Sequence, residues 1–96
     1  MFLVVLHQSG PEWEPSKPME EQSGWAAHAA FMDQLEADGF IVLGGPVGDD
    51  GRVVHAIEAE SEEAVRGTWA RDPWFESHLR LVSVEPWTIR LDSRPG

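Results

Sequence analysis

Apolar residues gather in short runs of strand length, separated by segments in which the apolar spacing widens to three or four. Runs rich in valine, isoleucine and leucine predict β-strands at residues 2–6, 40–43, 53–59 and 79–91. The first run is continuously apolar, which is typical of a central strand buried on both faces. Gly44-Gly45-Pro46 is expected to end the second strand, and Pro86 to break or kink the last, because proline donates no backbone hydrogen bond. Asp49-Asp50-Gly51 supplies turn chemistry, so the second and third strands are predicted to form a β-hairpin.

The wider spacing predicts two helices. Trp25, Ala29, Phe31, Met32 and Leu35 recur at three- and four-residue intervals inside a first helix expected over residues 19–37. The segment 10–18 is rich in proline, glutamate and serine and is expected to be a surface loop.

The second helix is expected to begin after Ser61, a good N-cap residue followed by two acids. It should end before Asp72, because Pro73 disfavours helical backbone in the residue ahead of it. The resulting order is β-α-β-β-α-β. This is an α+β, ferredoxin-like fold with an antiparallel sheet and both helices on one face.

The fold leaves one sheet face without helices, and the length allows a single domain. We expect that domain over residues 1–91, followed by a frayed tail at 92–96. In so small a domain an uncovered apolar sheet face favours a partner, and a second copy of the chain is the commonest solution. The sequence therefore predicts a homodimer.

The net charge and composition of the chain limit the classes of partner that it is expected to bind. A formal net charge of −10 argues against binding nucleic acid or an anionic membrane, because both reward clustered lysine and arginine. No stretch approaches a membrane span or a signal peptide. The absence of cysteine fits a reducing compartment, and we expect a cytoplasmic protein.

His28 is the most unusual residue of the predicted helical stripe, because its ionisable side chain lies among residues that should face the core. Asp72 is a second such residue, at a helix end beside Pro73 and Trp74. Together they would form an acid–base pair in a pocket. A simpler interpretation of His28 is a core histidine with one hydrogen-bond partner, and a simpler interpretation of Asp72 is the cap of an Asp-Pro turn. Both interpretations of Asp72 can hold together.

Several segments, in this order, resemble the YciI-like, or YCII-related, family. They are residues 28–35, Gly39, Gly44-Gly45-Pro46, Ser61-Glu62-Glu63-Ala64, Asp72-Pro73-Trp74 and Glu85-Pro86-Trp87. The resemblance implies a ferredoxin-like protomer, pairing as a dimeric α+β barrel, and a site centred on a histidine and an aspartate, which correspond to His28 and Asp72. One line of the family resembles a dehydrochlorinase. The chain departs from the family in having Ser77-His78 where a glycine is common, which places His78 near the pocket rim or alters the turn.

The remaining site residues are predicted to contact substrate. They are Gly44, Gly45, Pro46, Trp74 and His78. Backbone amides near the two glycines could stabilise a developing charge, although the same glycines are also typical of a strand-end bulge. The tryptophans are alternatively core or dimer-interface residues. The four histidines match no metal motif, so we expect neither metal nor cofactor.

These residues favour a small-molecule enzyme, a lyase or hydrolase that uses His28 and Asp72 for proton abstraction, elimination or hydrolysis. Without cysteine or a nucleophile-elbow serine, a covalent route is disfavoured. The alternatives are a non-catalytic dimeric module that binds a small ligand and a purely structural dimer.

Overall fold

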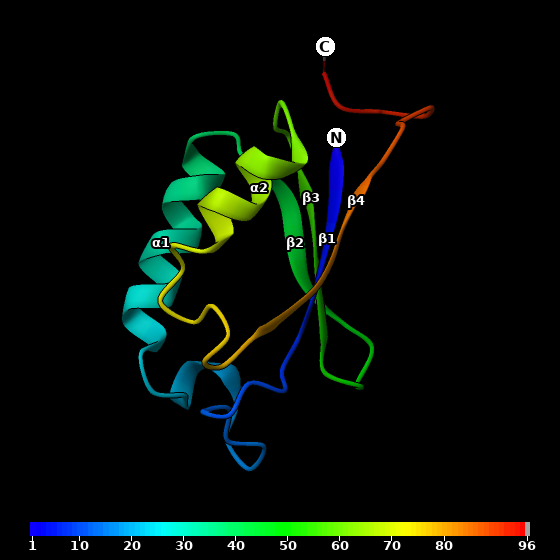
Figure 1. The fold of residues 1–96 in the computed structure, drawn as a ribbon. Helices are drawn as coiled ribbons and strands as arrows, with labels where there is room; N and C mark the ends of the chain where they lie inside the picture. Colours follow the sequence, from blue (N-terminus) through cyan, green and yellow to red (C-terminus); the bar gives the residue numbers. More distant parts are fainter. Residues whose placement is uncertain (96) are drawn as a thin grey trace.

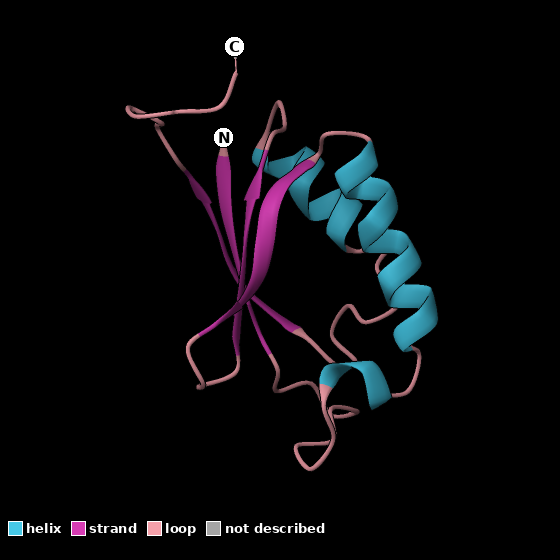
Figure 2. Cartoon of the chain, turned by 180° about the vertical axis from the view of Figure 1, so that it is seen from behind, coloured by secondary structure: helices cyan, strands magenta, loops and turns pink. Residues whose placement is uncertain are grey.

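The computed structural model describes residues 1–95, which form two layers, a sheet and the helices that cover one of its faces (Figure 1). The strands are β1 (Phe2–His7), β2 (Ile41–Val47), β3 (Arg52–Ile57) and β4 (Arg80–Pro86). They form one antiparallel sheet in the order β2-β3-β1-β4. The helices α1 (Trp25–Ala37) and α2 (Glu62–Trp69) lie on the same side of it (Figure 2).

The predicted α+β fold with an antiparallel sheet is confirmed. β1 lies between β3 and β4, and β2 is at the far edge, which is the interleaved strand order of ferredoxin-like proteins. Ser61 is the N-cap of α2, as expected, and its hydroxyl accepts a hydrogen bond from the backbone N–H of Ala64 at 3.1 Å.

The first helix begins later than the sequence pattern predicts. Met19–Glu21 form a separate 3₁₀ turn, and α1 begins only at Trp25. Gly24 separates them with a left-handed backbone, φ +72°, and a side chain there would crowd the indole of Trp74 at 3.2 Å.

A buried glutamine holds the surface loop that precedes this turn. The side chain of Gln22 accepts a hydrogen bond from the backbone N–H of Glu14 and donates to the carbonyl oxygens of Glu14 and Lys17, at 2.9, 2.7 and 2.9 Å. Three bonds from one side chain fix the loop against the start of α1.

Predicted strand ends also differ from the structure, and β3 ends at Ile57 instead of residue 59. Gly44-Gly45-Pro46 does not end β2 but lies inside it, and a bulge between Ile41 and Leu43 shifts the pairing with β3. Pro46 is tolerated because β2 is an edge strand. β4 ends at Pro86 instead of continuing to residue 91.

The two faces of the sheet have opposite character. On the helix side, cross-strand rows of mainly apolar residues form the core with α1 and α2, and Trp69 and Trp74 are its largest fully buried side chains. On the open side, one row across the sheet consists of Leu43, Ala56, Leu3 and Glu85. Leu43 is 66% exposed there. The described chain therefore leaves apolar surface uncovered.

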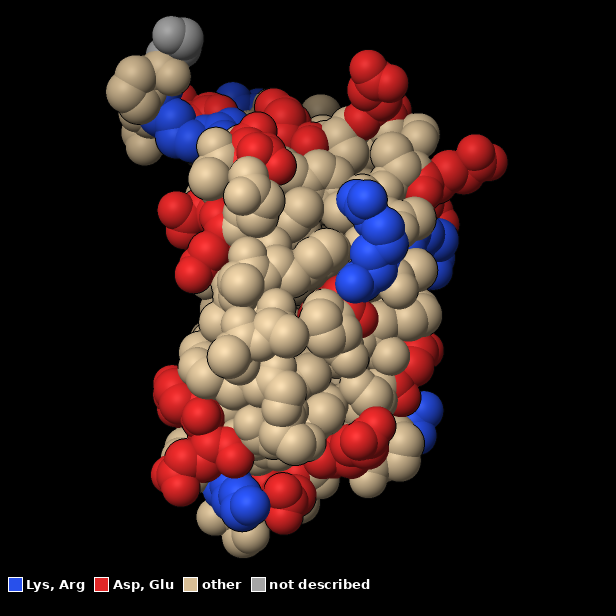
Figure 3. All heavy atoms as spheres, turned by 90° about the vertical axis from the view of Figure 1, so that its left-hand side faces the viewer, with Lys and Arg blue, Asp and Glu red and all other residues tan. Residues whose placement is uncertain are grey.

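The surface seen from the side of α1 carries several basic side chains, mostly away from its middle. Acidic residues lie mainly toward the edges of this face, and its middle is largely uncharged (Figure 3). This agrees with the sequence of α1, in which only Asp33 and Glu36 are charged. Within residues 1–95, no helix is long and apolar enough to cross a membrane.

Candidate functional site

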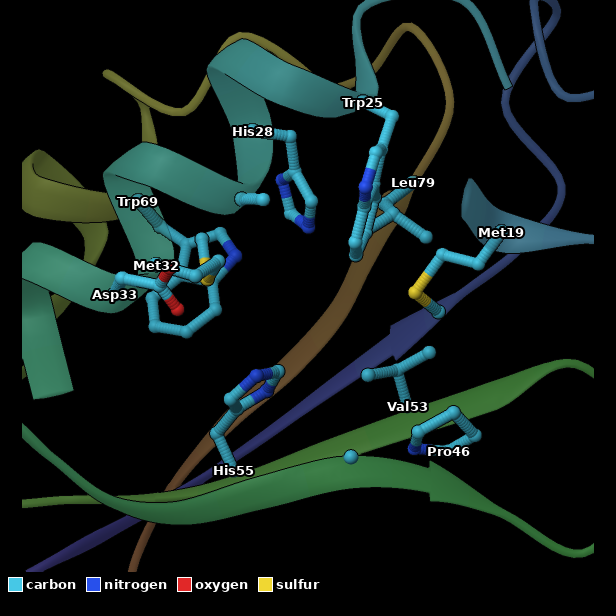
Figure 4. A pocket seen from close by; sticks show the side chains of 12 residues that line it. Met19, Trp25, His28, Met32, Asp33, Pro46, Val53, His55, Trp69 and Leu79 are labelled. Carbon is cyan, nitrogen blue, oxygen red and sulfur yellow. The ribbon is translucent and has the colours of Figure 1, made fainter. Parts of the chain in front are cut away.

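A cavity of about 250 Å³ lies between α1 and the helix side of the sheet. Figure 4 shows its walls, which come from the 3₁₀ turn, both helices, β2, β3 and Leu79, the residue just before β4. The lining residues are mainly aromatic or aliphatic. They are Met19, Trp25, His28, Ala29, Met32, Asp33, Gly45, Pro46, Val53, His55, Trp69 and Leu79. Such a space suits a small, mostly apolar molecule.

His28 and Asp72 are brought together at the inner wall of this cavity. Nδ1 of His28 lies 2.8 Å from Oδ1 of Asp72, and both side chains are buried. Because a carboxylate only accepts hydrogen bonds, Nδ1–H donates to it, and Nε2 retains the free lone pair. His28 lines the cavity, so the pair has the geometry of an oriented general base.

Asp72 also caps the turn that follows α2. Its Oδ1 accepts a second hydrogen bond from the backbone N–H of Trp74 at 3.0 Å, and its own N–H donates to the carbonyl of Trp69. The Asp-Pro turn therefore orients the carboxylate toward α1. Asp72 is therefore both the cap of this turn and the hydrogen-bond partner of His28.

An aromatic stack supports His28 from behind. The imidazole lies on the indole of Trp74 with ring centroids 4.1 Å apart and planes 8° from parallel. His78 stacks on the other side of that indole at 4.7 Å. Trp74 donates from Nε1 to the carbonyl of Ser23 at 2.9 Å, and Nε2 of His78 is hydrogen-bonded to the Ser23 hydroxyl at 2.8 Å. These contacts fix the plane of His28.

The predicted substrate contacts divide into three groups. Gly45 and Pro46 line the cavity, whereas Trp74 and His78 are buried behind His28 and are not among its lining residues. Gly44 faces the ring of His55 instead. The departure at Ser77-His78 coincides with a left-handed residue just before it, Glu76, φ 57°, a conformation that glycine adopts readily.

His55 is the cavity residue that the motif-based interpretation passed over, apart from its rejection as a metal ligand. It lies on β3 between Val53 and Ile57, and strand alternation places all three on the helix side. That alternation is a signal of the same kind as the one that singled out His28. Burial, followed by the charge of nearby His28, lowers the pKa of His55 to about 4, although Asp72 acts in the opposite direction.

Polar atoms without partners concentrate around this cavity. Within residues 1–95, the buried side-chain atoms that lack a hydrogen bond are Nδ1 of His55, Nε1 of Trp69 and Oδ2 of Asp72. No group of three or more histidine, cysteine, aspartate or glutamate side chains in that range is placed to hold a metal ion. His55 and Trp69, which carry two of these atoms, line the cavity and are therefore candidates for contact with an organic ligand.

Comparison with known proteins identifies the family. The model of the YCII-related domain matches residues 1–88, from the start of the chain to just beyond β4. A search of curated proteins gives no match. The matched range contains both helices, all four strands and every residue of the cavity. The chain belongs to the YCII-related domain family.

Proposed function

We propose that this protein is a small-molecule enzyme, a lyase or hydrolase, in which His28 acts as a general base and Asp72 orients it. The observation that carries the proposal is the 2.8 Å hydrogen bond from Nδ1 of His28 to Asp72 at the wall of a mostly apolar cavity. A base in such a place meets its substrate with little competing water.

The surroundings of His28 favour proton uptake at Nε2. When Nε2 takes a proton, the ring becomes an imidazolium, and the Asp72 carboxylate stabilises its charge. The indole face of Trp74, parallel to the imidazole, adds a cation–π contribution of roughly 0.5–2 kcal/mol. Both partners are held by backbone hydrogen bonds of their own, so the site needs little rearrangement during reaction.

The cavity indicates the class of substrate. Neither lysine nor arginine is among the described residues that line it, and Asp33 contributes an acid at its edge. An anionic molecule would therefore gain no counter-charge there. We propose a small neutral substrate, aromatic or otherwise apolar, from which His28 removes a proton in an elimination such as dehydrochlorination, or for which it activates water.

The test uses 5-nitrobenzisoxazole, a neutral aromatic probe of general bases. A base removes its ring C–H proton, the C–H electron pair completes a nitrile, and the N–O bond breaks to release a coloured phenolate. We expect the protein to accelerate this ring opening, and His28→Ala to reduce the rate by about 10²–10⁴-fold. Asp72→Asn should reduce the rate less while leaving the fold intact.

His7→Gln is the matched control, because His7 lies at the far end of β1 and bonds the carbonyl of Asp50. It should retain the wild-type rate. Probe turnover that His28→Ala leaves unchanged would contradict the proposal. A wild-type protein that binds the probe without opening it would also contradict it.

A second candidate function is a non-catalytic module that binds a small ligand. The unpaired Nδ1 of His55 and Nε1 of Trp69 favour this function. A ligand that forms hydrogen bonds with buried unpaired atoms is bound more tightly, whether or not it then reacts. Saturable binding of the probe without ring opening would favour this function over the enzyme.

We further propose that the protein is a cytoplasmic homodimer, paired through the open sheet face as a dimeric α+β barrel. The support is the exposed apolar surface of that face, on which Leu43 is 66% exposed. A two-fold pairing would cover it with an identical surface. The absence of cysteine fits the reducing compartment.

A further inference from the structure

His28 accounts for one wall of the cavity, and the opposite wall carries a second imidazole. His55 points from β3 into the same space that His28 enters from α1, and the two face each other across it (Figure 4). His55 is nine-tenths buried, and its Nδ1 has no hydrogen-bond partner within residues 1–95. A hydrogen bond to a ligand atom would remove the cost of leaving this buried ring nitrogen unpaired.

Trp69, whose ring packs against His55, supplies a second unpaired atom. Its indole lies edge-on to the ring of His55 with centroids 5.0 Å apart, and its Nε1 is also buried without a partner. An indole N–H can only donate, so the ligand group that satisfies it must be an acceptor. Among uncharged molecules that fit an apolar cavity, a carbonyl or ether oxygen is the usual acceptor.

Gly44 fixes the place of the His55 ring. The bulge in β2 pairs Gly44 with His55 on the helix side of the sheet. A Cβ at position 44 would lie 2.2 Å from Cδ2 and 2.8 Å from Cγ of His55. Any other residue would therefore push the ring away from β2, and glycine allows it to lie against the strand.

We propose that His55, together with Trp69, binds the oxygen of a neutral carbonyl-type substrate, while His28 faces its acidic C–H group. This assignment rests on the proposed function and names the substrate class of that site: a small ketone or a similar enolisable compound. Gly44 is a positioning residue, which acts through His55.

The assignment gives a balanced proton-transfer step. Nε2 of His28 takes the proton from the carbon next to the carbonyl, and the C–H electron pair becomes a C=C bond. The carbonyl π pair moves to the oxygen, which accepts hydrogen bonds from the N–H of neutral His55 and from Nε1–H of Trp69. The low pKa of His55 is consistent with this role, because it keeps the ring an uncharged donor at neutral pH.

The test compares two ligands of nearly identical shape, acetophenone and α-methylstyrene, which differ in C=O against C=CH₂. Their dissociation constants are measured for the wild type, His55→Phe and Trp69→Phe. We expect the preference of the protein for acetophenone over α-methylstyrene to fall about tenfold in each variant. Exchange of the acetophenone methyl protons with deuterated water should slow in parallel.

Gly44→Ala provides a variant that keeps every polar side chain of the cavity. It should lower the same preference by displacing His55, whereas Gly67→Ala, in α2 with no atom within 4 Å of the added Cβ, should leave it unchanged. If Gly44→Ala shifts the ¹⁵N resonances of His55 without changing the preference, the assignment is wrong.

The outcomes separate this assignment from the proposed function. His28→Ala should abolish proton exchange and keep the preference for acetophenone. A wild-type protein with the preference but no exchange would overturn the catalytic role of His28 and retain the oxygen site. A preference that survives both His55→Phe and Trp69→Phe would overturn the oxygen site, whatever the exchange rate.

Discussion

The two faces of the sheet reverse the usual distribution of polar and apolar groups. The covered face buries His28, His55 and Asp72 among aromatic residues, whereas the open face exposes Leu43. Buried ionisable groups cost stability in an isolated chain, and exposed aliphatic groups favour association with a partner. A small ligand in the cavity would stabilise the buried ionisable groups of the covered face. A large apolar surface of a partner would cover the exposed aliphatic groups of the open face.

The largest expected difference between the faces concerns their tryptophans. Trp74 is fully buried and packs against Trp13, Trp25 and two histidines, whereas Trp87, just after β4, is 45% exposed. Trp74→Ala should lower the free energy of unfolding by about 3–5 kcal/mol, because it removes a large side chain from the core. Trp87→Ala should cost less than about 1 kcal/mol in dilute solution.

Urea denaturation followed by circular dichroism would measure both losses. Equal losses for Trp74→Ala and Trp87→Ala would mean that the covered and open faces contribute alike to folding. A loss for Trp87→Ala that grows with protein concentration would instead place Trp87 in an interface.

The next effect is a dependence of stability on pH that originates on the covered face. The folded-state pKa of His55 is about 4, below its ordinary value of 6.5, chiefly because burial disfavours the imidazolium. Between these values the unfolded chain binds a proton that the folded chain does not. Stability should therefore fall as the pH drops from about 6.5 to about 4, by roughly 3 kcal/mol from this residue.

His55→Phe would isolate that contribution, because phenylalanine fills a similar volume and does not titrate. The difference in unfolding free energy between wild type and variant should change over this pH window and be constant above pH 7. His28 and Asp72, whose charges act on His55, are kept in both proteins. A difference that does not vary with pH would show that His55 is accessible to water in the folded protein.

The smallest effect on the folded monomer, and the sharpest test of the open face, is expected from Leu43→Glu. In a two-fold interface the substitution buries two like charges, which should weaken dimerisation by about 10–100-fold. The unfolding free energy of the separated monomer should change by less than about 0.5 kcal/mol. Sedimentation equilibrium would measure the dissociation constant.

Ala30→Glu, on the exposed side of α1, is the matched control for Leu43→Glu. It adds the same charge to the other face of the molecule and should leave dimerisation unchanged. A wild-type chain that sediments as a monomer at all concentrations would remove the pairing proposal.

The elements that follow a simple periodicity were predictable from the sequence. β1, β2 and β3 appear in the sequence as apolar runs, and the Asp-Gly turn between the last two indicates their hairpin. The order of these strands and the two helices along the chain then predicts the order of the strands in the sheet. The start of α1 was not predictable in the same way. Helical spacing continues through Met19, and only the left-handed backbone of Gly24, packed near Trp74, shows where the helix begins.

The site was predictable in part, for a related reason. His28 stood out as an ionisable residue in an apolar stripe, and the structure brings it to Asp72 across 44 positions of the chain. Their catalytic roles stay a prediction. The place of Gly44 depends on the bulge between Ile41 and Leu43, and a one-residue change of register reverses which side of the sheet a residue faces. Such a shift leaves no mark in the local sequence.

The stack of His28, Trp74 and His78 has an optical consequence. An indole lying against an imidazole loses fluorescence when that imidazole becomes charged, and Trp74 lies between two of them at 4.1 and 4.7 Å. In a chain whose other four tryptophans are replaced by phenylalanine, the emission of Trp74 would report the charge of its histidine neighbours without a label. The protein thus contains an internal indicator of protonation beside its candidate base.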